Sequence, residues 1–516
     1  MNSAVDDLLR ETIENAETIP ILPHDKKVIS YVETDYVCID QVDTAIDPAA
    51  ASNGSDAAEI LALAVPMFFS RVSWVGIKTT DSALLGHVGP GALAAASLSD
   101  LYTACSGVLI MGGGLGILVS QCAGSGNRVL AGIYLQVALI VLWTLSFAVG
   151  VVWWFTGAFW SRFLGDEGDP SVIGEAQYYS FVLSLCLPAR VAFSQLALFF
   201  ASQKIVSPEA NTSIVAVILN LGLGLVLVLG VPIRSFDGYG FNAAPAVTFF
   251  VIYFQIFFMW FVFCHIRRMH IPSWDGWAPS EITFSRIKTF CGIYFPMAFS
   301  SASDFWRMGI IGALAARMGS LEVAVFNASY RVIWMALIYT GKISQAAAVL
   351  TGTRLGSGDS AGARRASLTG IRASFSVQVV VTLLAARYAR ALGLVFSDDV
   401  EFLDMFETIR WPFVSMLFFM NMSVALENVP LSMGRTDEVL YCSLAGSWLG
   451  QVPCVFFLTT YWRRDLVGLF SGMSAGYALL LVLYSGIIIT SDWNKYAEDA
   501  RRRAEVTTLP HKNTTK

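Results

Sequence analysis

Charged residues are scarce in this chain. Only 14% of its 516 residues are Asp, Glu, Lys or Arg, against about 25% in an ordinary soluble protein. Six stretches of 24 residues or more carry no charged residue at all. Because a membrane span needs about 20 mostly apolar residues, the chain is predicted to be a multi-pass membrane protein. The uncharged stretches are 101–127, 129–160, 210–233, 238–266, 439–462 and 466–491.

Motifs for catalysis and metal binding are missing as well. There is no Walker motif, no His-Glu-x-x-His and no metal-spaced cluster of Cys and His, so neither ATP-driven pumping nor metalloenzyme chemistry is expected. The eight cysteines are scattered, which is typical of core thiols. A Gly-x-Ser-x-Gly pattern at 472–476 lies in an apolar stretch rather than between a strand and a helix, and indicates small-residue packing. We expect no enzyme activity, no cofactor and no metal site.

The chain also lacks basic character, and no cleavable signal peptide is expected. The net charge is −5, so nucleic acid is not an expected partner. Residues 1–57 contain twelve acidic and three basic residues before the first apolar run near Ile60. This segment is predicted to be a mostly disordered acidic tail.

What the sequence does contain is one pattern written twice. Pro-Met-x-Phe-Ser at 66–70 returns at 296–300, and Gly89 returns as Gly319. Gly-Ser-Gly-Asn, which begins at Gly124, returns as Gly-Ser-Gly-Asp from Gly356, so the offsets are 230, 230 and 232 residues. Internal repeats are typical of secondary transporters. Because lipid penalises unpaired backbone groups, we predict an all-α polytopic membrane protein with 12 transmembrane helices in two pseudo-symmetric six-helix bundles.

The predicted domains follow from this repeat. Two copies of six spans share one orientation, since six is even. The basic residues of the last segment favour placing both termini in the cytoplasm. The expected segments are the acidic tail 1–57, an N-terminal lobe 58–266, a linker 267–283, a C-terminal lobe 284–490 and a C-terminal tail 491–516.

Several stretches together resemble the MATE (multidrug and toxic compound extrusion) transporters. The segment 81–98 is similar to the signature of that family's first helix, and 203–208 with Asn220 is similar to its junction of helices four and five. Segments 296–306 and 431–435 resemble parts of its seventh and tenth helices. The resemblance covers about 58–490. It implies a cation-coupled antiporter with two six-helix lobes that exports mostly organic cations in exchange for protons or sodium.

Acids inside the spans are the first candidates for a coupling site, because ionisable groups in a membrane are costly and usually functional. Asp304 lies about 18 residues into the seventh predicted span, near the bilayer middle at about 1.5 Å per residue, and the resemblance implies an acid there. The alternative is a fixed ion pair with Arg307, three residues on. Asp81 matches an aspartate of the family, and its alternative is a pair with Lys78.

Other polar residues in the spans are weaker candidates. Asp100 departs from the family pattern, and either faces the cavity or is held by neighbouring serines. Glu427 lies near the place of an acid in eukaryotic relatives, and Asn220 either bridges helices or contributes to an ion site. Arg331 and Tyr330 lie early in the eighth span, where Arg331 lines the cavity, neutralises an acid or reaches the interface.

We therefore expect a cation-coupled antiporter, driven by protons rather than sodium, that exports cationic or amphipathic organic compounds by alternating access. The preference for protons rests on the resemblance of the seventh-helix acid to that of proton-coupled eukaryotic relatives. The alternative is a lipid or glycolipid flippase of the same superfamily, which a strongly basic central cavity would favour. The expected partners are a small organic substrate and the bilayer of the plasma membrane or an organelle. The protein is expected to be a monomer.

Overall fold

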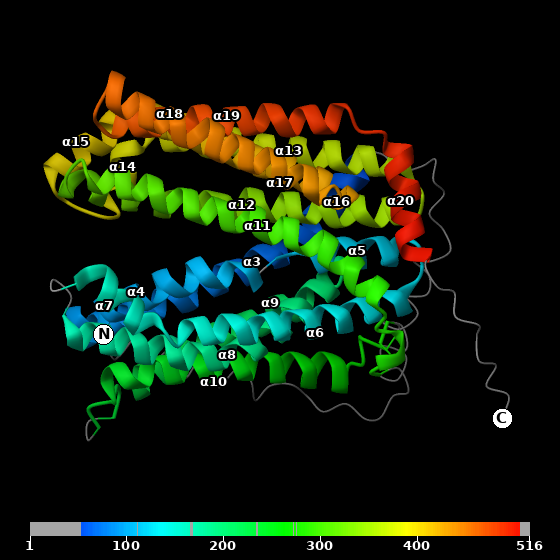
Figure 1. The fold of residues 1–516 in the computed structure, drawn as a ribbon, viewed down its shortest axis with the longest axis horizontal. Helices are drawn as coiled ribbons and strands as arrows, with labels where there is room; N and C mark the ends of the chain where they lie inside the picture. The colour runs from blue at the N-terminus through cyan, green and yellow to red at the C-terminus, as the bar shows by residue number, and fades with distance from the viewer. Residues whose placement is uncertain are drawn as a thin grey trace, which may run out of the picture. The chain divides into compact units, whose positions relative to one another are not determined.

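The computed structural model describes residues 53–110, 112–165, 169–233, 236–271, 273–274 and 276–505. Within those ranges the chain forms helices and their connections, and no strand occurs. Among the described residues, eleven helices are long and apolar enough to span a membrane. The twelfth span is α11 (Phe284–Ala316), which is 33 residues long but carries Asp304 and Arg307. The predicted fold class of twelve helices in two bundles is confirmed (Figure 1).

The helices of the two lobes follow the chain in order. The N-terminal lobe contains α3 (Asn53–Val88), α4 (Pro90–Gly107), α5 (Gly114–Gly124), α6 (Arg128–Trp153), the short α7 (Thr156–Leu164), α8 (Pro170–Ser202), α9 (Ser207–Leu227) and α10 (Ala243–Phe258), which continues as a π-helix over Met259–Ile266. The C-terminal lobe contains α11, α12 (Ser320–Gly356), α13 (Ser360–Arg387), α14 (Ala389–Leu394), α15 (Val400–Thr408), α16 (Arg410–Met433), α17 (Thr436–Leu444), α18 (Val452–Phe457) and α19 (Leu466–Ile489). A last helix, α20 (Trp493–Glu505), follows.

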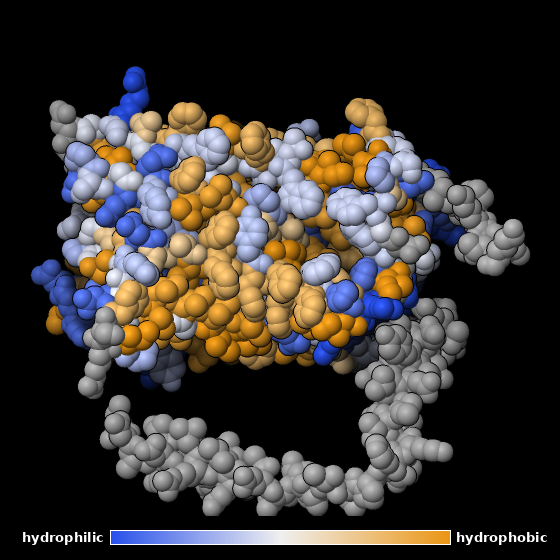
Figure 2. Space-filling view, turned by 90° about the horizontal axis from the view of Figure 1, so that it is seen from below, coloured by the Kyte–Doolittle hydropathy of each residue, from blue (hydrophilic) through white to orange (hydrophobic). Residues whose placement is uncertain are grey.

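The surface has the pattern of a membrane protein. Figure 2 shows mostly apolar side chains across the middle of one face and more hydrophilic ones toward its two ends. Large apolar residues such as Phe250, Phe257 and Val482 expose more than half of their surface. Exposure on this scale suits contact with lipid and would be a liability in water.

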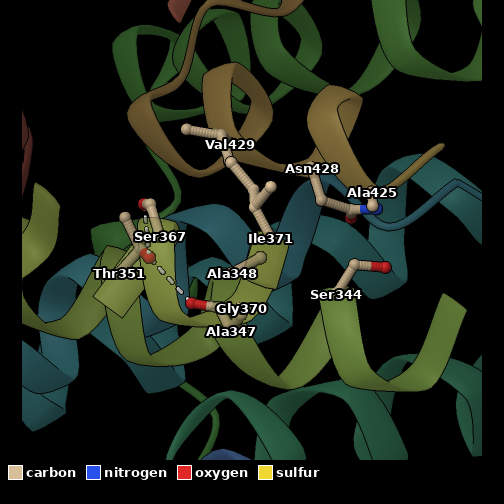
Figure 3. Close-up of a pocket in the computed structure, with 10 residues that line it drawn as sticks. All are labelled: Ser344, Ala347, Ala348, Thr351, Ser367, Gly370, Ile371, Ala425, Asn428 and Val429. Carbon is tan, nitrogen blue, oxygen red and sulfur yellow. Dashed lines mark hydrogen bonds between the residues drawn. The ribbon is translucent and has the colours of Figure 1, made fainter. Parts of the chain in front are cut away.

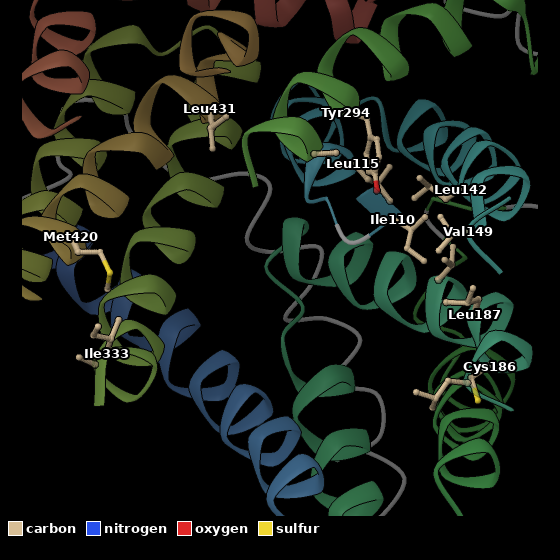
Figure 4. Close-up of a cluster of buried hydrophobic side chains, with 14 of the residues drawn as sticks. Ile110, Leu115, Leu142, Val149, Cys186, Leu187, Tyr294, Ile333, Met420 and Leu431 are labelled. Carbon is tan, nitrogen blue, oxygen red and sulfur yellow. The ribbon is translucent and has the colours of Figure 1, made fainter. Parts of the chain in front are cut away.

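The second span is not the single helix that the sequence predicts over 92–122. It breaks between α4 and α5, where Gly112 and Gly114 face Tyr294 of α11. A Cβ atom on Gly114 would stand 2.9 Å from the Cα atom of Tyr294, so only glycine allows the two chains to approach this closely. The Tyr294 hydroxyl accepts from the Gly112 N–H (3.1 Å) and donates to the Leu109 carbonyl (2.9 Å). Figure 4 shows Tyr294 packed beside Leu115 in the same region.

The first span begins earlier than predicted. Asn53 is the first residue of α3, whereas the sequence places the start near 58. Asp56 is fully buried and forms an ion pair with Arg354 at the far end of α12 (2.5 Å). The pair joins the two lobes and explains why the helix extends into the predicted tail. The rest of that tail, residues 1–52, lies outside the described residues.

The two lobes meet at one end of the bundle, which we call the α20 end, and α7 lies at the opposite end (Figure 1). Phe68 of α3 stacks on Tyr339 of α12, with ring centroids 4.7 Å apart. Along α11, the contact between the lobes that lies farthest from the α20 end is a hydrogen bond of 3.4 Å, which Trp306 Nε1 donates to the Cys105 carbonyl of α4. Beyond it, toward α7, no hydrogen bond, ion pair or ring contact joins the lobes in the described part of the chain. The facing sides of α3, α4, α11 and α12 are thus without a partner lobe at the α7 end.

The repeated glycines make the contact at the α20 end possible. Gly124 ends α5 and Gly356 ends α12, and each packs against the other lobe. A Cβ atom on Gly124 would stand 1.8 Å from the carbonyl oxygen of Thr353, and one on Gly356 would stand 2.0 Å from that of Gln121. The two glycines occupy matching places in the repeat, so the lobes contact each other reciprocally through the same element.

Helix α20 crosses this contact and touches both lobes. Arg503 donates to the Gln121 side-chain oxygen of α5 (3.1 Å) and to the Met433 carbonyl of α16 (2.8 Å). Asn127 of the N-terminal lobe donates to the Ala504 carbonyl (2.8 Å). The segment predicted as a C-terminal tail therefore contains a helix that connects the two lobes at the α20 end.

A single methyl group on Gly124 should open the α20 end. Gly124→Ala places a Cβ atom against a backbone oxygen that cannot move away cheaply, and overpacking costs about 1–3 kcal/mol. Cys122, which is 1% exposed on the same helix, reports the change when the other cysteines are replaced. We expect maleimide to label Cys122 about tenfold faster in the variant, since local opening governs access to a buried thiol. Gly222→Ala is the control, because nothing lies within 4 Å of a Cβ atom there; equal labelling in all three proteins would contradict the packing argument.

Candidate functional site

The N-terminal lobe holds a buried acid that is bonded only to neutral groups. Asp81 of α3 is 7% exposed. Its Oδ1 accepts from Asn220 Nδ2 of α9 (2.9 Å), and its Oδ2 accepts from the Thr248 hydroxyl of α10 (3.3 Å). The other side-chain atom of Asn220, its Oδ1, is buried without a hydrogen-bond partner among the described residues. Three helices therefore converge on one carboxylate.

Asp81 does not pair with Lys78, which the sequence offers as its alternative partner. Lys78 instead binds Asp100 of α4, with 2.9 Å between Nζ and Oδ1. Both members of this pair are partly exposed, at 33% and 44% of their side-chain surface. The three-residue spacing along α3 suggested Asp81 as the partner of Lys78, but the ammonium group of Lys78 pairs with Asp100 of the neighbouring helix α4. The negative charge of Asp81 is therefore left without a cation at ion-pair distance in the described chain.

The C-terminal lobe holds two acids around one buried arginine. Arg307 of α11 is 2% exposed and lies 3.1 Å from Asp304. Its guanidinium donates to Tyr477 (3.0 Å) and to the hydroxyl of Ser447. Glu427 of α16 interacts electrostatically with both Arg307 and Asp304. The ion pair that the sequence leaves open for Asp304 is present, but one carboxylate remains in excess.

The remaining candidates lie apart from these acids or support them. The ring of Tyr330 stands 6.0 Å from that of Trp334, in the interior of the C-terminal lobe. Arg331 is exposed on α12 and forms no ion pair with any described residue. Thr248 was missed in the sequence-based analysis; its only signal there is a lone hydroxyl in an apolar run.

Two hollows in the structure do not suit an organic substrate. One lies among α12, α13 and α16, where Thr351 and Ser367 share a hydrogen bond of 2.9 Å (Figure 3). Its volume is about 10 Å³, enough for about one water molecule. The other, of about 240 Å³, lies near His265 and His270, where α10 leads into the linker and away from both acids.

Comparison with known proteins identifies the family of the chain. The family model MatE matches residues 66–226 and 296–457, which is one match in each lobe. Multidrug and toxin extrusion protein 2 of Mus musculus is 23% identical, over 87% of this chain and 77% of its own length. Multidrug and toxin extrusion protein 1 of Xenopus tropicalis is 24% identical, over 89% and 78%. Protein DETOXIFICATION 52 of Arabidopsis thaliana is 22% identical, over 89% of both chains.

Solved structures give the same fold. The eukaryotic MATE transporter AtDTX14 superposes with a TM-score of 0.78, at 19% identity, over 88% of this chain and 99% of its own. A Vibrio cholerae MATE transporter superposes with a TM-score of 0.75, at 16% identity, over 86% and 99%. The chain belongs to the MatE family of multidrug and toxin extrusion transporters, which are integral membrane transport proteins rather than enzymes.

Proposed function

We propose that this protein is a proton-coupled antiporter that exports amphipathic organic compounds by alternating access. The observation that carries the proposal is the environment of Asp81. A buried carboxylate without a nearby cation is costly in the membrane, so the site favours gaining a positive charge. Its neighbours are an amide and a hydroxyl, which can bond to either the charged or the protonated carboxyl group.

Protons suit this site better than sodium. A hard cation prefers several oxygen ligands. Asn220 and Thr248 both donate hydrogen bonds to Asp81. Among the described residues at this site, only the buried Oδ1 of Asn220 is an amide oxygen without a hydrogen-bond partner, so few oxygens are available to coordinate sodium. A proton needs no such shell. When it binds, the Asp81 carboxyl becomes a donor and the bonds to Asn220 and Thr248 must rearrange.

Helix α3 connects this site to the contact between the lobes. Asp81 lies thirteen residues after Phe68 on one continuous helix, a distance of about 20 Å. Phe68 stacks on the other lobe. A shift of α3 on protonation of Asp81 would therefore be transmitted directly to the contact between the lobes. Alternating access requires such a coupling between ion binding and the relative position of the lobes.

The C-terminal acids supply a second place for a proton. Asp304 and Glu427 share one arginine, so the group carries one net negative charge when both acids are ionised. Protonation of either acid would neutralise it. We also place both termini and the α20 end in the cytoplasm, so that the lobes of this structure are closed toward the cytoplasm and separate at the opposite side.

Transport into proteoliposomes under imposed ion gradients tests the proposal. Purified protein would be assayed with a panel of fluorescent amphipathic dyes of both charge signs. We expect a pH gradient to drive dye movement, a protonophore to stop it, and a sodium gradient at constant pH to have no effect. Dye movement driven by sodium alone, or independent of any gradient, would contradict proton coupling.

A further inference from the structure

Four charged residues gather where the lobes meet, and neither acid site uses them. Arg71 of α3, Arg190 of α8, Glu209 of α9 and Lys342 of α12 each lie within a membrane-spanning helix and are each partly exposed. We call them the interlobe cluster. Charged side chains within membrane spans usually face a cavity or one another rather than lipid, so we expect these side chains to face the space between the lobes.

Side-chain contacts connect α3, α9 and α12 at the cluster. Ser70, the neighbour of Arg71, donates to Glu209 Oε1 at 2.7 Å. Lys342 follows Tyr339 by one helical turn, and Tyr339 stacks on Phe68 one turn before Arg71. Electrostatic interactions link Lys342 to both Glu209 and Arg71, and Arg71 to Arg190.

The cluster has more positive than negative charge. Lys78 and Asp100 neutralise each other in an ion pair of 2.9 Å, so Asp100 is not free to serve Arg190. Arg71, Arg190 and Lys342 form no ion pair with any carboxylate of the described chain. Glu209 is the single acid within the cluster, which leaves an excess of two positive charges.

Aromatic surface lies directly beside these cations. The Arg71 guanidinium stands 4.3 Å above the ring of Trp74, which is 40% exposed. Tyr339 is 48% exposed although it stacks on Phe68. An organic body can therefore pack on rings while its charged group reaches the cluster.

From this arrangement we infer that the interlobe cluster binds the anionic group, a carboxylate, sulfonate or phosphate, of an amphipathic aromatic or lipid-like compound. Guanidinium and ammonium groups are the preferred partners of such oxyanions. The inference rests on the proposed transport function and names its substrate class. The sequence-based expectation is a cationic or amphipathic compound; this inference keeps the amphipathic body and gives it an anionic group instead of a cationic one.

The cluster also explains how such a group would be released. Arg71 and Arg190 belong to the N-terminal lobe, and Lys342 belongs to the C-terminal lobe. An anion bound by all three would require the two lobes to be in contact, as they are at the α20 end. When the lobes part there, the anion loses the contribution of Lys342, so its affinity falls in the other state. A ligand shifts a transporter between states only through such a difference in affinity.

Binding to the purified protein tests the inference independently of transport. The probes are a fluorescent aryl sulfonate and the same aryl body carrying trimethylammonium. We expect the sulfonate to bind, and Lys342→Met and Arg71→Gln each to weaken its binding about tenfold or more, since each removes a charge-assisted hydrogen-bond donor. Lys342→Arg should retain binding. Arg390→Met removes a cation from an exposed ion pair with Asp404 and should change nothing.

Each outcome decides one question. No sulfonate binding, or equal binding in Lys342→Met and the unaltered protein, would overturn the inference even if cationic dyes are transported under a pH gradient. Sulfonate binding that depends on Lys342 supports it, and failure of all gradient-driven transport would then count against the proposed antiport alone. A fluorescent phosphatidylglycerol in the liposomes distinguishes the sources of the anion: Lys342-dependent movement of the lipid between leaflets indicates a headgroup, and sulfonate uptake alone indicates a soluble compound.

Discussion

Asp81→Asn should abolish proton-driven transport and leave the fold intact. The amide has nearly the same shape as the carboxyl group but cannot gain or lose the proton. It can still bond to Asn220 and Thr248. We expect the initial rate of dye movement under a pH gradient to fall about 100-fold, as for removal of an essential proton carrier. Thermal stability in detergent should stay the same or rise, because a buried charge has been removed.

Asp100→Asn is the matched control for this experiment. It makes the same chemical change in the same lobe, but Asp100 belongs to a partly exposed ion pair with Lys78. Such a pair contributes about 1 kcal/mol or less, so transport should persist. Full proton-driven transport by Asp81→Asn, or equal losses in the two variants, would contradict the role of Asp81.

Arg307→Met should strongly destabilise the C-terminal lobe. The variant removes the one cation of the group and leaves Asp304 and Glu427 facing each other without compensation. The hydroxyls of Ser447 and Tyr477 also lose their donor. Breaking a buried ion pair from one side costs about 3–5 kcal/mol; Arg307 is buried but Asp304 keeps 42% of its side chain exposed, so the loss should lie toward the lower end of that range. Unfolding in detergent, followed by heat or denaturant, measures the effect.

The double variant Arg307→Met with Asp304→Asn separates charge from packing. If the destabilisation comes from an uncompensated carboxylate, removing that carboxylate should restore about half of the lost stability. Arg410→Met provides a surface comparison, because Arg410 pairs with Glu407 while both are about one-third exposed. Equal stability of Arg307→Met and Arg410→Met would contradict the buried-pair account.

The fold could be predicted largely from composition and from the repeat. Apolar stretches of sufficient length define spans without any knowledge of tertiary contacts. The matching glycines Gly124 and Gly356 fixed the alignment of the two halves, and the structure gives the physical reason in their close approach to the opposite lobe. Glycine at these two positions can be recognised in the sequence because no residue with a side chain fits the close approach of the two backbones.

Contacts between helices could not be predicted in the same way. Spacing along α3 suggested that Lys78 would pair with Asp81, but the closer acid comes from α4. Thr248 carries no signal of its own and gains its importance only because α10 packs beside α9. Breaks such as that near Gly112 depend on a side chain, Tyr294, that lies 182 residues away.

Charge balance illustrates the same limit. Acids and bases in the spans nearly cancel when they are counted along the sequence. The structure pairs Lys78 with Asp100 and Arg307 with Asp304, and it leaves Arg71, Arg190 and Lys342 without an ion pair among the described residues. The electrostatic character of the site is therefore set by which pairs form, and a count of residues does not contain that information.

Proton release on substrate binding tests the central claim most directly. Purified protein in weakly buffered detergent, slightly below neutral pH, would be mixed with a transported dye while a pH indicator follows free protons. If substrate and proton exclude each other through Asp81, binding must expel the proton, because linkage is reciprocal. The account predicts release of roughly one proton from the unaltered protein and none from Asp81→Asn. The same release from both proteins would contradict it.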